Sequence, residues 1–318
     1  MEKKLGKATR DAYGLAIVEI GRKNPDVVVL DADLSKSTKS AGFQAAFPDR
    51  FFNVGIQEAN MVGVASGLAA AGKIPFISSF ATFLISKGYD QLRMAVAFPE
   101  LNVKVVGSHG GISVGEDGAS QMSIEDLALT TSLPNFVVMV PCDEFSTRAL
   151  VMQAAEHKGP VFIRTCRPKA PIVHNEKSDF KIGKGVLLRE GKDVTIVAAG
   201  LLVFEALQAA ENLSKQGIQA GVIDMHTIKP LDRELLVREA KKTGHLVVAE
   251  EHQIWGGLGS AVATAVSQEA PCRMEFVAIQ DTFAESGLPD ELLVKYGLTA
   301  PNVEAAAKRV LQAPANAE

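Results

Sequence analysis

A carboxylic acid at the expected start of a helix is the first residue that could carry chemistry. Glu58 lies in the stretch NVGIQEANMVGVASG, just after an expected strand. Its neighbours Val54, Ile56 and Met61 are apolar, and the helix that follows is rich in Gly and Ala. Burial would raise the pKa of this carboxyl, whereas the positive end of the helix would lower it. Both a buried acid and a surface carboxylate that only stabilises the helix fit this position.

A glycine-rich loop supplies the second group of candidates. The stretch GSHGGISVGEDG, residues 107–118, follows an expected strand and carries His109 and Asp117. Glycine permits positive φ angles and close approach of the backbone to a ligand, and loops of this kind often carry function. A histidine at the end of a strand is otherwise usually structural. Its occurrence with Asp117 on one such loop favours a binding site.

Cations near the expected ends of elements form a third group. Arg10 and Arg167 both lie there, and Ser37 follows directly after a strand. Taken singly, each arginine is more often a surface charge. Guanidinium groups are nevertheless the preferred bidentate partners of phosphate, and a serine adds a hydroxyl or N–H donor.

The elements that must position these residues alternate between strands and helices, as parallel α/β sheets require. The first unit is expected to have strands at Val27–Asp31, Phe51–Val54, Pro75–Ser79, Val103–Ser108, Phe136–Val140 and Val161–Thr165. Its expected helices are Thr9–Arg22, Gln57–Ala71 (closed by Gly72), Ile85–Ala97, Ile124–Thr131 and Phe145–Glu156. The candidate residues therefore follow the carboxyl ends of strands, where open α/β sheets bind ligands.

A second, smaller unit follows. Its expected strands are Val194–Ala199, Ala220–Asp224, His245–Glu250 and Met274–Ile279, with helices at Phe204–Gln216, Arg233–Thr243 and Leu258–Gln268. Residues 166–190 are expected to connect the units and to lead into a hairpin-like stretch, and residues 313–318 to fray. The fold class is thus α/β with two parallel-sheet domains, divided as 1–170, a linker at 171–190, and 191–318.

Composition narrows the classes of function. The chain has 318 residues, a net charge of −4 and dispersed basic residues, which argues against nucleic acid or an anionic membrane as a partner. It shows no signal-peptide pattern and no apolar run long enough for a membrane helix. Its three cysteines are far apart, which favours a reducing, cytoplasmic compartment. No phosphate-loop motif and no set of metal ligands is recognised; GGLGS at 256–260 is interpreted as a helix start.

Six motifs in order resemble the C-terminal half of transketolase, across essentially the whole chain. They are DADLSKST, NVGIQEANMVGVASGLA, FATF, GSHGGISVGEDGASQMSIEDLAL, FIRTCRP and TIKPLD. The resemblance implies a thiamine-diphosphate pyrimidine-binding domain followed by the family's C-terminal domain. It also implies transfer of a two-carbon ketol unit from a ketose phosphate to an aldose phosphate through a thiamine-diphosphate carbanion.

The resemblance assigns roles to the cofactor-facing residues. Glu58 matches the acid that hydrogen-bonds the pyrimidine ring and drives its aminopyrimidine into the imino form. Phe83, in FATF, matches the aromatic that stacks on this ring, with Ile56 and Tyr89 as further contacts. The segment LISKGYDQ is one residue longer than in animal relatives, which weakens the match of Tyr89.

The resemblance also assigns the substrate-facing residues. His109, Asp117 and Gln121 match positions that bind sugar hydroxyls, and Arg10, Ser37 and Arg167 match those that bind the substrate phosphate. Gln121 stands where many microbial members have His, as it does in animal-type members. This shifts proton transfer towards His109, which is expected to be catalytic, or towards the cofactor's imino group.

The family's GDG motif and its downstream Asn, which hold Mg²⁺ (or Ca²⁺) and the diphosphate, are not found in this sequence. The EDG at 116–118 lies in the other domain. The resemblance therefore implies a split enzyme, inactive without an N-terminal partner subunit that carries GDG, in an α₂β₂ assembly in which this chain self-associates. One alternative is the β subunit of a thiamine-dependent 2-oxo-acid dehydrogenase, whose substrates carry no phosphate. The other is a non-catalytic regulatory subunit, against which Glu58, Phe83, His109 and Asp117 together argue.

Overall fold

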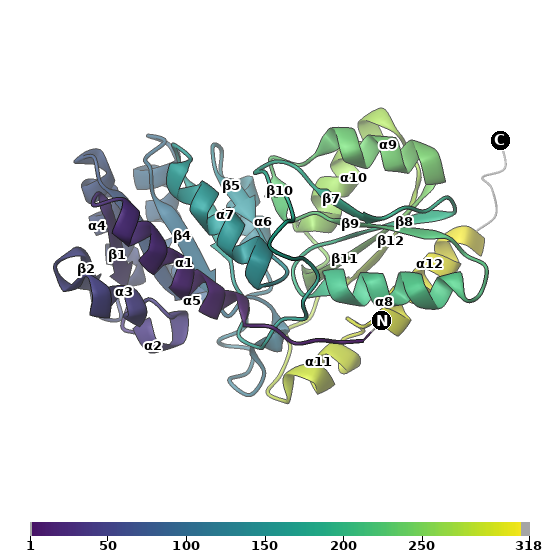
Figure 1. The fold of residues 1–318 in the computed structure, drawn as a ribbon, viewed down its shortest axis with the longest axis horizontal. Coiled ribbons are helices and arrows are strands. Elements are labelled where there is room, and N and C mark those ends of the chain that lie inside the picture. The colour runs from purple at the N-terminus through teal and green to yellow at the C-terminus, as the bar shows by residue number, and fades with distance from the viewer. Residues whose placement is uncertain (1, 313–318) are drawn as a thin grey trace.

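The chain folds into two α/β halves, each built around its own sheet (Figure 1). This computed structural model describes residues 2–312, so the expected fraying at 313–318 lies outside the described residues. The α/β class and the two-sheet architecture are confirmed. Each sheet is parallel except for one edge strand that runs the other way.

The first sheet has seven strands in the order β10-β5-β6-β4-β3-β1-β2. Its strands are β1 Val27–Asp31, β2 Phe51–Asn53, β3 Ile74–Phe80, β4 Lys104–Ser108, β5 Val137–Met139, β6 Val161–Arg164 and β10 Thr227–Lys229. The run VVVLD of β1 is buried at every position, as expected for a strand covered on both faces. Val27 and Val29 enter one core, and Val28 and Leu30 enter another, because successive side chains point to opposite faces.

Helices cover both faces of this sheet. They are α1 Thr9–Lys23, α2 Ser35–Thr38, α3 Ala41–Ala46, α4 Glu58–Ala70, α5 Ala81–Gln91, α6 Asp126–Ser132 and α7 Glu144–Glu156, with short turns at Pro48–Arg50 and Ile112–Val114 and a π-helical segment at Leu92–Ala97. α1 packs on α7 on one face, and α4 packs on α5 on the other. Gly72, at φ 90°, ends α4 where a glycine stop was expected.

The second sheet has the strand order β12-β11-β8-β9-β7. Its strands are β7 Val186–Arg189, β8 Val194–Ala198, β9 Ala220–Asp224, β11 His245–Gln253 and β12 Arg273–Ile279. The helices are α8 Leu202–Ser214, α9 Arg233–Thr243, α10 Leu258–Glu269, α11 Pro289–Lys295 and α12 Ala300–Gln312. GGLGS does start a helix, because the Glu250 carboxylate accepts the N–H groups of Leu258 and Gly259 at 2.7 Å each.

Two expectations about elements were wrong, and one strand was missed. The hairpin expected before residue 190 does not form, because β7 pairs antiparallel with β9. α5 begins at Ala81, directly after β3, rather than at Ile85. The strand β10 was not expected at all: it follows β9 in the chain yet pairs with β5 of the first sheet.

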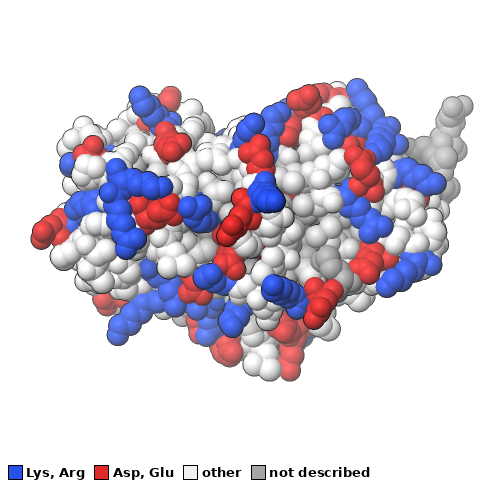
Figure 2. Space-filling model, in the orientation of Figure 1, with Lys and Arg blue, Asp and Glu red and all other residues white. Residues whose placement is uncertain are grey.

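The two halves are joined by more than the connecting segment. β10 crosses from the second half into the first sheet, and one apolar core contains both Leu127 of the first half and Leu236 of the second. Among residues 2–312, no helix combines the length and the apolarity that crossing a membrane requires. Lysine, arginine and acidic side chains are interspersed on the face shown in Figure 2.

Asp143 couples a helix start to the connecting segment. One carboxylate oxygen accepts the Ser146 N–H at 2.9 Å and so caps α7. The other accepts the N–H groups of Val173 and His174 at 3.0 and 2.7 Å. The side chain is buried, so these bonds have no water to replace them.

Asp143→Ala is expected to lower the free energy of unfolding by about 3 kcal/mol, because it removes a helix cap and leaves two backbone donors unpaired. Urea unfolding followed by circular dichroism measures this change. The matched control is Asp179→Ala, whose side chain is 79% exposed and which should change stability by less than about 0.5 kcal/mol. Equal stability of both variants would contradict the proposed coupling.

Candidate functional site

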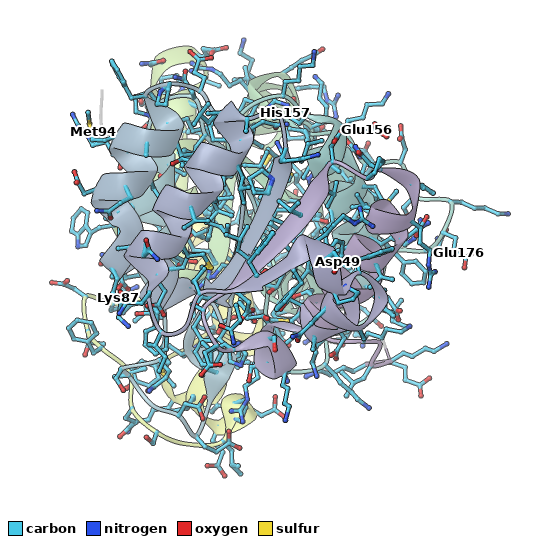
Figure 3. All side chains as sticks on the ribbon, turned by 90° about the vertical axis from the view of Figure 1, so that its left-hand side faces the viewer. Asp49, Lys87, Met94, Glu156, His157 and Glu176 are labelled. Atoms are coloured by element: carbon cyan, nitrogen blue, oxygen red, sulfur yellow. The ribbon has the colours of Figure 1, made fainter. Side chains whose placement is uncertain are left out.

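The candidate residues gather where the strands of the first sheet end. The loops after β1, β2, β4 and β6, together with the starts of α1, α4 and α5, meet at this edge. In Figure 3, Lys87 of α5 lies at this end of the half, whereas Met94, Glu156 and His157 lie towards the opposite end. The site is therefore built from short connections held by a rigid sheet.

Glu58 is the first residue of α4 and is only 2% exposed. Its Oε1 accepts a hydrogen bond from Ser79 Oγ at 3.3 Å, and its Oε2 lies 3.3 Å from Lys87 Nζ. The side chain of Lys87 is half-exposed, so only one partner of this ion pair reaches water. Of the two interpretations open from the sequence, the buried acid is the one the structure shows.

An aromatic wall runs from α5 to the glycine-rich loop. The rings of Phe80 and Phe83 stack with centroids 5.5 Å apart, and His109 stacks on Phe80 at 3.7 Å. Lys87 Nζ lies 4.6 Å from the centroid of Phe83, so this ammonium contacts both the buried acid and an aromatic face. Ile56, on the loop before Glu58, is 70% exposed.

These groups fit a flat ring with a basic nitrogen, such as a pyrimidine. The buried carboxyl of Glu58 offers the hydrogen-bonding group, and Phe83 offers a partly accessible face for stacking. In this structure Lys87 contacts both Glu58 and the Phe83 ring. Its long side chain is half-exposed and can turn towards solvent.

Tyr89 is placed differently from Phe83. Its hydroxyl donates to the backbone oxygen of Leu129 at 3.2 Å and lies 2.7 Å from Ser132 Oγ. Six residues of helix separate it from Phe83, which puts the two rings on different faces of α5. Tyr89 therefore packs α5 against α6, and its contact with a cofactor stays a prediction.

His109 is a buried, neutral imidazole in a left-handed backbone conformation, at φ 60°. Desolvation first, and then the Arg10 guanidinium, lower its pKa to about 3. Nε2 lies 3.3 Å from Arg10 Nη1 and Nδ1 lies 2.8 Å from Ser108 Oγ. Because a guanidinium can only donate, Nε2 accepts, and the proton resides on Nδ1.

Arg10 links three of the candidate residues. Its Nη1 donates to the backbone oxygen of Ser37 at 3.0 Å and contacts His109. Desolvation lowers the pKa of Arg10, and the nearby Arg167 lowers it further. Two cations thus approach one another at this edge, as an anion site requires.

Arg167 is held by the loop that carries Asp117. Its Nη1 pairs with Glu116 Oε2 at 2.6 Å, donates to the backbone oxygen of Val114 and lies 4.0 Å from Asp117 Oδ1. Gln121 is half-buried and accepts from Ser120 Oγ at 2.5 Å. The structure thus unites Arg10, Ser37 and His109, and separately Arg167 with Asp117.

Two buried carboxylates support these loops, and the sequence analysis missed both. Asp31 accepts from Leu34 N at 2.6 Å, from Thr38 Oγ1 at 2.7 Å and from Ser40 Oγ at 2.8 Å, which fixes the loop that carries Ser37. Glu251, on β11, accepts the Ser113 N–H at 2.6 Å within the glycine-rich loop.

The second half therefore shapes the glycine-rich loop. A Cβ at Gly111, where φ is 83°, would collide with the Glu251 carboxylate. A Cβ at Gly118 would collide with Ser286. Gly111 and Gly118, which were expected to let the backbone approach a ligand, also leave space for side chains of the second half.

Of the other missed residues, two carried a signal in the sequence. Lys87 stands four residues after Phe83, the spacing at which helical side chains meet. Phe80 opens FATF, three residues before Phe83. Glu251 gave no such signal, because it lies 138 residues from Ser113 in the chain.

Known proteins match the chain along most of its length. Residues 6–172 match the family described as transketolase, pyrimidine binding domain, and residues 183–303 match the family described as transketolase, C-terminal domain. The 6-deoxy-6-sulfo-D-fructose transketolase subunit SqwH of Clostridium sp. (strain MSTE9) is 44% identical over 303 residues, which cover 95% of this chain and 94% of that protein.

Two further matches differ in how much of the relative this chain spans. Human transketolase is 42% identical over 295 residues, which cover 92% of this chain but only 47% of that protein. A solved structure titled "Split gene transketolase, inactive beta4 tetramer" is 52% identical, with a TM-score of 0.91, and the match covers 96% of this chain and 99% of that one.

His109 is expected to stay neutral throughout pH 5–8. Since its pKa in the folded chain is about 3, against 6.5 for an unperturbed imidazole, only the unfolded chain binds this proton near pH 5. Stability contributed at this position is therefore present above pH 6.5 and is lost as the pH falls towards 3. Histidine NMR titration checks this, with His109→Gln to assign the resonance; a midpoint near 6.5 would contradict the buried geometry.

Proposed function

The chain belongs to the transketolase family, and we propose on that premise that it is the pyrimidine-binding subunit of a split, thiamine-diphosphate-dependent transketolase. The reaction is transfer of a two-carbon ketol unit from a ketose phosphate to an aldose phosphate. The observation that carries the proposal is the buried carboxyl of Glu58 beside the accessible ring of Phe83. The family matches favour this function over that of a 2-oxo-acid dehydrogenase β subunit.

Glu58 is the group that exchanges a proton with the cofactor's pyrimidine. Thiamine diphosphate, when bound, supplies the nucleophilic carbon that accepts the ketol unit. Glu58 would hydrogen-bond the ring nitrogen and would hold or release a proton at its carboxylate, while Phe83 and Ile56 would support the ring. Lys87 would give up its contact with Glu58 and turn outward, which would free the carboxyl for the ring.

A partner subunit holds the diphosphate and the metal. Mg²⁺ and Ca²⁺ prefer oxygen ligands. Among residues 2–312, the one close group of three metal-ligating side chains combines Cys142, His174 and Asp224 and therefore does not suit either ion. We assign Mg²⁺ (or Ca²⁺) to an N-terminal subunit with the GDG motif, and we divide the present chain at 1–170, 171–190 and 191–318.

The outward face of α4 supports a subunit contact next to Glu58. Gly63, Val64 and Gly67 are exposed on it, and a Cβ at either glycine would meet nothing within 4 Å. No charged residue occurs from Ala59 to Ala71. An uncharged, exposed helix face of this kind is typical of a protein interface. Because α4 starts at Glu58, a subunit packed here would close the pocket around the acid.

Substrate binding uses the polar side of the same edge. Arg10, Ser37 and Arg167 bind the terminal phosphate, for which Arg167 exchanges its pairing with Glu116. His109, Asp117 and Gln121 bind the sugar hydroxyls. The unprotonated Nε2 of His109 can accept a hydrogen bond from a hydroxyl, and a pKa of about 3 makes this imidazole a weak base, so its proposed catalytic role is to orient and polarise that hydroxyl.

The purified chain alone is expected to show no ketol transfer, because the proposed binding site for the diphosphate of the cofactor belongs to the partner subunit. Adding the GDG-containing subunit, thiamine diphosphate and Mg²⁺ should restore activity, with an α₂β₂ mass by light scattering. The related structure whose title names an inactive beta4 tetramer supports this expectation. Full activity of the isolated chain would refute the split arrangement.

Glu58→Gln in the reconstituted complex is expected to lower turnover by about 10²-fold or more, because an amide cannot exchange the proton. The matched control is Glu156→Gln, an exposed carboxylate at the far end of the half (Figure 3), which should keep wild-type activity. Steady-state kinetics at saturating cofactor compares the two. Wild-type turnover of Glu58→Gln would end the assignment.

A further inference from the structure

A second group of chemically reactive side chains lies buried between the two halves. Cys142 follows β5 in the first half, His174 belongs to the connecting segment, and Asp224 ends β9 in the second half. The three side chains each offer one ligand atom, and these atoms all lie within 4.8 Å of one another. All three residues are at most 5% exposed. We call Cys142, His174 and Asp224 the junction cluster.

The junction cluster is held from several sides. His174 Nε2 lies 2.8 Å from Asp224 Oδ2, and Cys142 Sγ donates to the same oxygen at 3.5 Å. The backbone of His174 is fixed by its N–H bond to Asp143 at 2.7 Å. Ser146 Oγ lies 3.7 Å from the sulfur. The imidazole is thus aimed by a fixed backbone rather than by a mobile loop.

Two buried polar atoms in this region have no hydrogen-bond partner. They are the second carboxylate oxygen of Asp224, Oδ1, and Nε2 of His226. His226 follows Asp224 by two residues, the spacing that places side chains on one side of an extended chain. The Phe180 ring lies edge-on to His174 at 4.7 Å and to His226 at 5.6 Å. Unpartnered polar atoms in such a place destabilise the fold unless a ligand satisfies them.

We propose that the junction cluster is a structural Zn²⁺ site, with Cys142, His174 and Asp224 as three ligands and His226 as the fourth. Thiolate, imidazole and carboxylate groups all bind zinc, and four such ligands would complete a tetrahedral site. The thiolate and the carboxylate together balance the charge of the ion. This inference rests on the geometry of these residues and is independent of the proposed catalytic function.

The three residues of the junction cluster need only small shifts to bind the ion, whereas the His226 side chain has to turn towards them, because its ring nitrogens are not among the ligand atoms that lie within 4.8 Å of one another. Zinc bonds of about 2.0–2.2 Å to nitrogen and oxygen set tetrahedral ligands about 3.3 Å apart, so the His174–Asp224 contact opens by about 0.5 Å. Burial raises the pKa of the Cys142 thiol, so the ion replaces a proton that leaves to solvent. The bound ion would join the first half, the connecting segment and the second half at one point.

The test uses the full chain, stripped with a chelator and then given Zn²⁺ alone. After desalting, elemental analysis should find one zinc per chain, and the thermal midpoint should rise. Co²⁺ in place of Zn²⁺ should give the absorption of a tetrahedral thiolate complex. Cys142→Ser and His174→Gln should both lose stoichiometric binding. Cys272→Ser, which alters a half-buried cysteine outside the junction cluster, should bind as the wild type does.

Substoichiometric zinc in the wild type would overturn the proposal, as would equal binding by wild type and Cys142→Ser. If Cys142→Ser does not fold, as judged by circular dichroism, His226→Gln serves as the second variant. It should weaken Zn²⁺ binding at least about tenfold, by loss of one ligand. If His226→Gln bound Zn²⁺ with unchanged affinity, His226 would not be a ligand, and the proposed four-ligand site would be contradicted.

Discussion

Burial of one carboxyl at the edge of a sheet is the constraint on which the site depends. Glu58 begins α4 directly after the loop that follows β2, and its side chain is 2% exposed. That placement requires an apolar helix behind it and strands β1 and β3 beside it. It also leaves α4 with an uncharged outer face. The helix that begins with the acid therefore also carries the surface that a second subunit is proposed to cover, so the proposed chemistry and the proposed assembly involve one structural element.

The second half contributes to the site by contacting the glycine-rich loop. Glu251 binds the backbone of the glycine-rich loop, and Gly111 and Gly118 lack side chains where this half approaches. His109, in the same loop, has a left-handed backbone conformation. Conformations of this kind persist only where the surrounding structure fixes them. A glycine-rich loop thus does not by itself indicate a flexible lid. Here it is a loop held rigidly between two domains.

Much of this arrangement could be predicted from local sequence. Buried runs such as VVVLD, the glycine stop at Gly72 and the clustering of motifs after strands all gave correct expectations. What failed depended on distant residues. β10 is three residues long and is defined only by its pairing with β5, and β7 takes its partner from β9 rather than from an adjacent hairpin strand. Glu251 and the junction cluster are likewise invisible to motif reasoning, because their partners come from separate elements. Asp31 differs, because its partners Leu34, Thr38 and Ser40 follow it closely in the chain.

The most direct measurement is a crystal structure of the chain assembled with its partner and thiamine diphosphate. The account predicts a carboxylate oxygen of Glu58 within hydrogen-bond distance of a pyrimidine ring nitrogen. Phe83 should lie against the ring, Lys87 should be displaced from both, and α4 should be covered by a subunit. A cofactor bound with Glu58 still paired to Lys87 and remote from the ring would contradict the account.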